Sequence, residues 1–95
     1  MERHFTIHVR ARNDHAVLQR ILLAFSRRRL RIQALQFFDV DAHRPAELQV
    51  DLDCRPEDAR AVLAQLQGIV EVQQAWVDEA VTGAAIADEP RLVAA

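Results

Sequence analysis

The sequence predicts a single α+β domain, in which one antiparallel sheet carries two helices on one face. Its 95 residues suit one domain. Short segments in which apolar and polar residues alternate are typical of strands, and two other segments repeat apolar residues at helical spacing. These segments follow one another as strand, helix, strand, strand, helix, strand. With 51% hydrophobic and 27% charged residues, the composition is that of a folded chain.

The first strand and the first helix occupy the first third of the chain. Alternating apolar residues indicate a half-buried strand, and they are Phe5, Ile7, Val9 and Ala11. Asn13 and Asp14 interrupt the alternation, and both are favoured at a helix N-cap. The next apolar residues, spaced along one helical face, predict an amphipathic helix from Asp14 to Arg29. Its last turn would carry Arg27, Arg28 and Arg29, whose charge the helix dipole favours there.

The second and third strands form a predicted hairpin. The second runs from Ile32 to Val40, and its adjacent Phe37 and Phe38 cannot share one face. Both faces of this strand are therefore partly apolar. Residues 41–45 form the turn. Residues 46–54 alternate strictly between apolar and polar, and we expect this third strand to pair antiparallel with the second.

The second helix and the last strand complete a domain that spans residues 1–79. Pro56 suits the first position of a helix, and Gly68 suits its end. The last predicted strand runs from Val70 to Val77. Residues 80–95 are rich in Ala and have no period. We interpret them as a tail that is flexible, or ordered only against a partner.

The order β-α-β-β-α-β, with right-handed crossovers, predicts the ferredoxin-like sandwich. In this fold the first and third strands lie side by side in the centre of the sheet. His8 and Arg10 on the open face would then neighbour the acidic residues of the third strand, which are Glu47, Asp51 and Asp53. Opposite charges on neighbouring strands support this pairing.

Several classes of chemistry are disfavoured by what the chain contains. Two glycines cannot build a Gly-rich phosphate loop. Cys54, the one cysteine, ends a strand and is more typical of a small core residue than of a nucleophile. His4 and His8 would lie about 13 Å apart on one sheet face, too far for one ion, so we expect no metal site.

Nucleic acids and membranes are also disfavoured as partners. The net charge is −2, and the open face of the central strands has no aromatic residues for base stacking. No stretch has the pattern of a signal peptide or of a membrane-spanning helix, so we expect a cytoplasmic protein. Residues 27–29 and Arg31 have two interpretations, a solvated helix end matched to the dipole or a basic contact surface, and the first is favoured.

Four short motifs occur in a fixed order along the chain. Residues 13–22 read NDHAVLQRIL and residues 25–28 read FSRR. Residues 32–35 read IQAL, and residues 65–72 read QLQGIVEV. Together, over about residues 3–78, they resemble the ACT-domain family, and more narrowly the small regulatory subunit of acetolactate synthase. That family has L-x-R-I/V, F-S-x-R, I-x-S-L and Q-L-x-K-L-V-D-V at the corresponding places.

The resemblance implies a non-catalytic subunit that binds a catalytic large subunit. That partner uses thiamine diphosphate, magnesium and FAD in branched-chain amino acid biosynthesis, and we expect no cofactor on the small subunit. Small subunits raise the activity, and many confer feedback inhibition by valine. Family dimers join edge strands side by side and hold the amino acid between subunits. The dimer edge would then include Ile32, Leu35, Phe37 and Phe38.

The resemblance also implies an effector site in the first loop and at the start of the second strand. Its residues would be Asn13, Asp14, His15, Ala16, Val17, Arg31 and Ile32. Long family members have Gly in place of Ala16, where it lets backbone amides approach a bound carboxylate, and Asn in place of Arg31. These departures indicate a degenerate site for a branched-chain amino acid. With the lack of a second domain, they make the chain most similar to the short subunit of the valine-insensitive isozyme.

Two other functions remain open. A stand-alone ACT-type module could sense an amino acid on behalf of another enzyme or regulator. A small ferredoxin-like enzyme of the acylphosphatase type would need an anion-cradling loop, and the sequence contains none.

Overall fold

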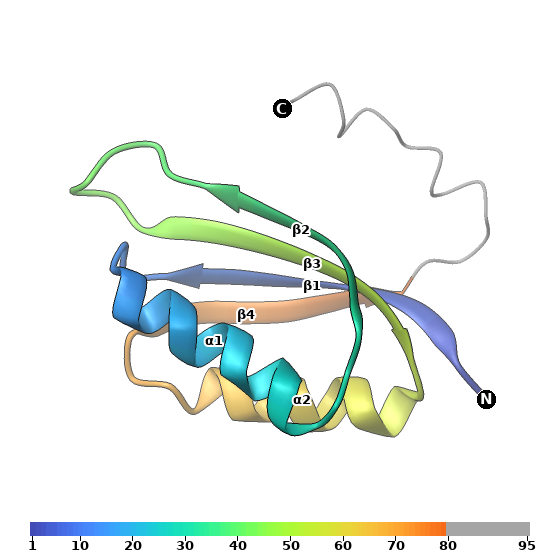
Figure 1. The fold of residues 1–95 in the computed structure, drawn as a ribbon. Helices are drawn as coiled ribbons and strands as arrows, with labels where there is room; N and C mark the ends of the chain where they lie inside the picture. Colours follow the sequence, from blue (N-terminus) through green and yellow to red (C-terminus); the bar gives the residue numbers. More distant parts are fainter. Residues whose placement is uncertain (80–95) are drawn as a thin grey trace.

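The computed structural model describes residues 1–79, and within them the chain forms four strands and two helices. The strands are β1 (Arg3–Ala11), β2 (Ile32–Phe38), β3 (Ala46–Cys54) and β4 (Val72–Glu79), and the helices are α1 (His15–Arg27) and α2 (Pro56–Gln67). The strands form one antiparallel sheet in the order β2-β3-β1-β4, with both helices on one side of it (Figure 1). The ferredoxin-like fold class and the central pairing of the first and third strands are confirmed. The predicted tail, residues 80–95, lies outside the described residues.

The core lies between the sheet and the two helices. Side chains of a strand alternate between its faces, so the apolar set of β1 and that of β3 share the face that the helices cover. Ile7 is opposite Val50 in the pairing of these strands, and both are fully buried. The helices contribute apolar residues at helical spacing, which are Val17, Ile21, Ala24 and Phe25 from α1 and Ala59, Val62 and Leu66 from α2. Each large side chain buried in this way stabilises the fold by about 1.5–3 kcal/mol.

Helix α1 begins at His15 because Asp14 caps it. The backbone N–H of Ala16 donates a hydrogen bond to Asp14 Oδ1 at 2.8 Å, which satisfies an amide that has no partner inside the helix. This hydrogen bond is the main cause that lowers the pKa of Asp14 below its ordinary value of 3.8, and the nearby Arg12 lowers it further. The predicted N-cap is confirmed.

The end of α1 differs from the prediction. The helix ends at Arg27, with Arg28 as its C-cap, and Arg29 adopts a left-handed conformation with φ of 57°. The Arg29 N–H donates to Ser26 O at 2.9 Å, and the Leu30 N–H donates to Phe25 O at 3.1 Å. This pair of bonds is a Schellman motif, which most often has Gly at the left-handed position. The prediction that all three arginines lie in the last turn of the helix is therefore wrong, since only Arg27 does.

Two strand boundaries also differ from the predictions. Val70 is 92% exposed in the turn before β4, because the Val72 N–H closes that turn on Ile69 O and the strand begins only there. Strand β2 ends at Phe38 instead of Val40. The turn that follows is stabilised by Asp41, whose side chain accepts the His43 N–H at 2.8 Å.

The left-handed residue yields the first testable prediction. Replacing Arg29 by Gly removes the steric cost of a side chain at positive φ. We therefore expect the free energy of unfolding to rise by about 0.5–1 kcal/mol. Urea denaturation of both proteins measures this difference. The matched control is Arg27→Gly, within the helix, which should destabilise by a similar amount. A loss of stability in Arg29→Gly would contradict the assignment of a Schellman motif.

The N-cap yields a second prediction, on pH dependence. Folding lowers the pKa of Asp14, so the ionised carboxylate stabilises the folded state. This effect is complete at pH values above the ordinary pKa of 3.8, and it disappears as the pH falls through the folded-state pKa. Thermal unfolding from neutral pH down to about pH 2 should therefore show a smaller acid-induced loss of stability in Asp14→Asn, which keeps a capping side chain but cannot titrate. Asp14→Ala should be less stable than Asp14→Asn at neutral pH. Parallel acid profiles for all three proteins would contradict this role of the carboxylate.

Candidate functional site

The expected effector residues of the first loop lie where β1 leads into α1, and the side chains of Asn13 and Asp14 are bonded within the chain. Asn13 Nδ2 donates to Asp39 Oδ1 at 2.6 Å and to Asp41 O at 3.1 Å, which ties this loop to the turn after β2. Val17 is 1% exposed, so its side chain belongs to the core. His15 and Ala16 are exposed on the first turn of α1.

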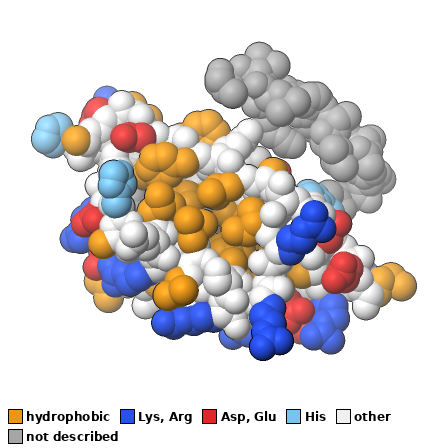
Figure 2. Space-filling view, in the orientation of Figure 1, with side chains coloured by type: hydrophobic (Ala, Val, Ile, Leu, Met, Phe, Trp, Pro, Cys, Tyr) orange, Lys and Arg blue, Asp and Glu red, His pale blue; other side chains and the backbone are white. Residues whose placement is uncertain are grey.

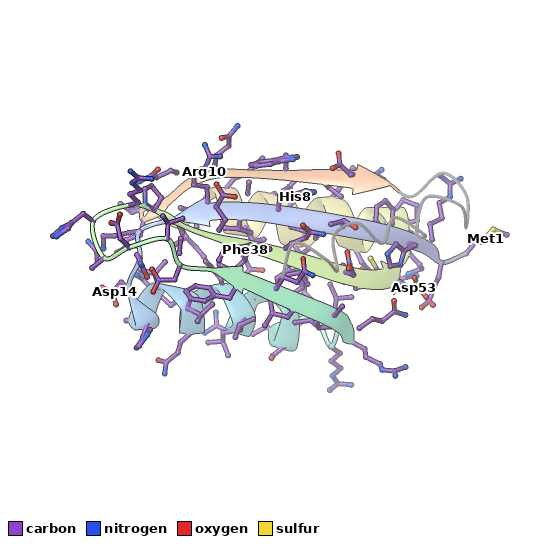
Figure 3. The ribbon with its side chains drawn as sticks, turned by 90° about the horizontal axis from the view of Figure 1, so that it is seen from above. Met1, His8, Arg10, Asp14, Phe38 and Asp53 are labelled. Carbon is purple, nitrogen blue, oxygen red and sulfur yellow. The ribbon has the colours of Figure 1, made fainter. Side chains whose placement is uncertain are left out.

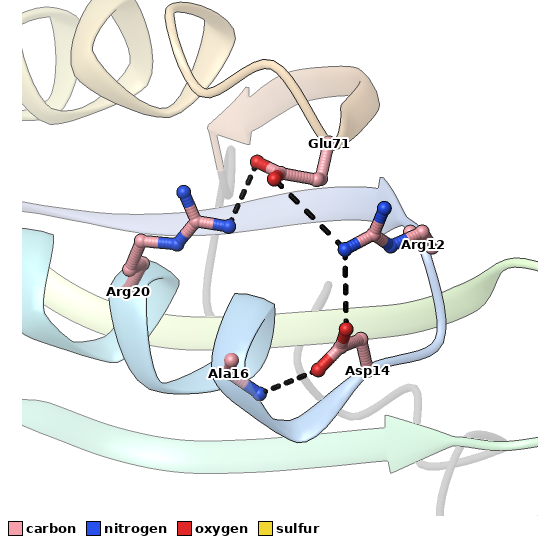
Figure 4. Close-up of polar contacts among 5 residues, drawn as sticks. All are labelled: Arg12, Asp14, Ala16, Arg20 and Glu71. Atoms are coloured by element: carbon pink, nitrogen blue, oxygen red, sulfur yellow. Dashed lines mark hydrogen bonds and ion pairs between the residues drawn. The ribbon is translucent and has the colours of Figure 1, made fainter.

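The amide at the N-terminus of α1 that would receive a ligand carboxylate already has an acceptor. Asp14 binds the Ala16 N–H through one carboxylate oxygen and Arg12 Nη2 through the other, at 3.1 Å (Figure 4). The carbonyl of Asp14 accepts the Val17 N–H at 3.0 Å. The carboxylate of Asp14 therefore stands in the position of an anionic ligand at this helix end.

Glu71, from the turn before β4, joins this network. Its buried Oε1 lies 2.8 Å from Arg20 Nη2, and its Oε2 lies 4.0 Å from Arg12 Nη2 (Figure 4). Arg20 is the main cause that lowers the pKa of Glu71. The backbone carbonyl of Glu71 also accepts the Arg12 N–H at 3.0 Å. This network fixes the first turn of α1 against the end of β1 and the start of β4.

The remaining effector residues, Arg31 and Ile32, lie at the far end of α1. The chain runs the whole length of the helix between the two groups, a rise of about 20 Å for a helix of this length. Ile32 packs partly buried against the core, and Arg31 is exposed just before β2. One chain therefore does not bring the two halves of the expected site together.

The β2 edge, residues 32–38, has a hydrogen-bonded neighbour on one side only, because β2 is the outermost strand next to β3. It contains no charged residue, although such edges usually carry charges or proline that prevent pairing. Its register is irregular between Ile32 and Ala34 and regular from there to Phe38. Five residues of this strand, from Ala34 to Phe38, thus offer a regular, uncharged edge after the irregularity.

Apolar side chains on both faces accompany this edge. Leu35 and Phe37 are opposite Val50 and Leu48, so they point to the helix side, yet they are 43% and 40% exposed. Phe38 lies on the open face and is 37% exposed (Figure 3). Figure 2 shows hydrophobic side chains exposed together between β2 and α1. Of the expected dimer-edge residues, Leu35, Phe37 and Phe38 are thus accessible, whereas Ile32 is partly buried against the core.

The open face of the sheet is polar and paired across strands. His4 lies 2.8 Å from Asp53, Thr6 donates to Asp51 at 2.6 Å, and Arg10 pairs with Glu47 at 3.0 Å. The expected neighbours are confirmed for Arg10 and Glu47, whereas Asp51 and Asp53 bond Thr6 and His4 instead of His8. The bonds from His4 and Gln33 lower the pKa of Asp53.

His8 differs from this pattern, because its neighbours come from β4. Its ring stacks on Trp76 with centroids 5.0 Å apart, and Nε2 lies 2.9 Å from Asp78. The sequence analysis did not place Trp76 on the open face. Its phase was obscured by the adjacent apolar residues Ala75 and Val77.

A nucleophilic cysteine and a metal site are two kinds of reactive centre that the described residues can be checked for. Cys54 is 2% exposed, and burial raises the pKa of its thiol, which disfavours the thiolate. Among residues 1–79, no group of three or more His, Cys, Asp or Glu side chains is placed to hold a metal ion. Within the same residues, no helix is long and apolar enough to cross a membrane.

Comparisons with known proteins support the fold. No protein-family model matches the chain, and no curated protein matches it in sequence. Among solved structures, it is similar to the ACT domain from GTP pyrophosphokinase of Chlorobium tepidum, with a TM-score of 0.72, 9% identity, and coverage of 82% of this chain and 100% of that one. An uncharacterized protein from Thermotoga maritima gives a TM-score of 0.72 at 11% identity, with coverage of 83% and 98%.

A third similar structure belongs to a much longer chain. The homoserine dehydrogenase from Thiobacillus denitrificans matches with a TM-score of 0.67 at 14% identity over 83% of this chain, which spans 17% of that enzyme. At these identities the likeness concerns the backbone fold. The protein therefore has an ACT-like ferredoxin fold.

Proposed function

We propose that the protein is a non-catalytic ACT-type regulatory module that works as a homodimer on a client enzyme. The observation that carries the proposal is the β2 edge, which is uncharged, unpaired within residues 1–79, and bordered by exposed Leu35 and Phe37 in a fold shared with ACT domains. An edge of this kind is stabilised by pairing with another strand. Small domains also gain stability from association, because their own cores are thin.

A second copy of the chain fits this edge in charge as well as in shape. Antiparallel pairing of β2 with its copy about a two-fold axis would place the start of one strand beside the end of the other. The start carries Arg31, and the end leads to Asp39 and Asp41. Opposite charges would therefore meet at both ends, and Leu35 and Phe37 would meet their counterparts near the middle.

The same pairing would bring together the two parts of the expected effector site, which are the first loop and the start of β2. Arg31 and Ile32 of one copy would come near the loop of the other, since Asn13 is bonded there to Asp39. In each copy, however, Asp14 and Asp39 already accept the N–H groups of Ala16 and Asn13. These contacts support a module whose effect on its client is not inhibited by valine.

We propose the catalytic large subunit of acetolactate synthase as the client. The support for this choice is the ordered sequence resemblance over residues 13–35 and 65–72. Thiamine diphosphate, magnesium and FAD would be held by that large subunit. An ACT-type sensor of an amino acid for a different enzyme is the alternative, and the same fold serves both.

The dimer is tested by sedimentation at micromolar concentrations. We expect the unmodified protein to sediment as a dimer and Phe37→Glu to sediment as a monomer, because a carboxylate would be desolvated between the two strands. The control is Val70→Glu, which adds the same charge at an exposed apolar residue in the turn before β4. A monomer for the unmodified protein, or a dimer for Phe37→Glu, would count against this interface.

The client is tested by acetolactate formation. The large subunit from the same organism is assayed alone, with this protein, and with this protein plus valine. We expect the protein to raise the rate, and the rise to persist with valine. Should the rate not change and the two proteins not co-purify, the acetolactate synthase assignment fails. Thermal shifts with a panel of amino acids then test the sensor alternative, because a ligand that binds the folded state raises its stability.

A further inference from the structure

We infer that Arg27, Arg28 and Arg29, at the end of α1, form a docking surface for an acidic segment of a partner protein. These three residues are named the arginine surface below. The inference deepens the proposed function, on which it rests for the assumption that the partner is a protein. It concerns the end of α1, whereas the proposed dimer uses the free edge of β2.

Within residues 1–79, the arginine surface has no carboxylate partner, and no ion pair is found for Arg31 or Arg60 either. Five arginines elsewhere form ion pairs with Asp or Glu, and they are Arg10, Arg12, Arg20, Arg44 and Arg55. Within residues 1–79, Arg27 and Arg29 form no ion pair, and Arg28 Nε contacts the neutral Gln65 Oε1 at 3.4 Å. Three adjacent cations are thus exposed without internal neutralisation.

The helix dipole explains only part of this cluster. It favours cations close to the C-terminal carbonyls, by about 0.3–1 kcal/mol each at the surface. Only Arg27 of the three lies in the last turn of α1. Arg29 lies past the cap at φ of 57°, where Gly would avoid the steric cost that a side chain has there. A residue kept in an unfavourable backbone conformation favours a functional reason for its side chain.

An apolar side chain borders the cations. Leu23 is 43% exposed and precedes Arg27 by one helical turn, so the two side chains lie on the same face of α1. Arginine beside an exposed apolar residue is typical of the centre of protein interfaces. The partner segment that fits this surface carries Asp or Glu next to an apolar side chain.

A protein segment fits better than a nucleic acid. Binding of nucleic acid commonly involves about 6–10 phosphate contacts, which exceeds what three arginines supply. The chain as a whole has a net charge of −2, so a long polyanion would be repelled by the rest of the surface. A short acidic segment would contact the three arginines without reaching the acidic parts of the surface.

The test uses a fluorescent peptide of alternating Glu and Leu residues as the probe, with a Gln-for-Glu peptide and a single-stranded RNA beside it. Anisotropy is measured at about physiological salt and at about 1 M salt, where charge interactions are screened. The variant Arg27→Gln/Arg29→Gly removes two charges and the backbone strain. The control Arg10→Gln/Arg44→Gln removes two charges from the open sheet face and the turn after β2.

We expect the acidic peptide to bind the unmodified protein and the control alike, and to bind the Arg27→Gln/Arg29→Gly variant about five- to tenfold more weakly, as the loss of two exposed ion pairs predicts. Binding should weaken in high salt. The inference is overturned if the peptide does not bind, if the control loses as much affinity as the variant, or if the RNA binds more tightly than the peptide.

The acetolactate assay with the same two variants separates this inference from the proposed function. If the unmodified protein does not raise the rate while the peptide binds through the arginines, the client assignment fails and the arginine surface stands. If both variants raise the rate as the unmodified protein does and the peptide does not bind, the client assignment stands and the inference is wrong.

Discussion

The pairing of β1 with β3 over nine residue pairs is the interaction on which the other features of the molecule depend. It aligns Ile7 with Val50 on the side that the helices cover, and Thr6 with Asp51 on the open side. A slip of one residue would turn every side chain of a strand to the other face and bring Asp51 into the core. Because β1 and β3 pair in the centre, β2 and β4 are left as the edges of the sheet.

This arrangement has a consequence for association. The two helices bury the apolar face of the central strands, whereas Leu35 and Phe37 on β2 stay about two-fifths exposed on the same side. An uncharged edge strand is ready to pair with another strand, and the exposed apolar side chains beside it are stabilised by burial. A homodimer through β2 would use both features at once, which is why the edge is the main support for the proposed regulatory role.

The N-terminus of α1 shows how local contacts can occupy the place where the sequence predicted an effector. Asp14 caps the helix with a carboxylate, Arg12 holds that carboxylate, and Glu71 holds Arg12 and Arg20 in turn. Each group in this chain of contacts is neutralised by the next. An external carboxylate would have to displace Asp14 and would leave it without the Ala16 N–H, so the arrangement disfavours binding of an amino acid there.

Much of the fold was predictable from the sequence, because periodicity reports which face of an element is buried. The alternation in residues 46–54, the helical spacing from Leu18 to Phe25, the capping residue Asp14 and Pro56 at the start of α2 each determine local structure by themselves. The position of Asn13 and Asp14 at the start of α1 followed from the same signals. The end of α1 did not, since Arg29 occupies a left-handed position that glycine would have indicated.

Contacts between distant segments were decided by the tertiary structure alone. Arg12, Arg20 and Glu71 come from three separate parts of the chain, and no spacing in the sequence relates them. The exposure of Leu35 and Phe37 follows from the place of β2 at the sheet edge, and the stacking of Trp76 on His8 follows from the pairing of β4 with β1. The sequence determined which residues form strands and helices, because those depend on neighbours along the chain. Only the packing of the elements decided which groups are satisfied and which remain available to a partner.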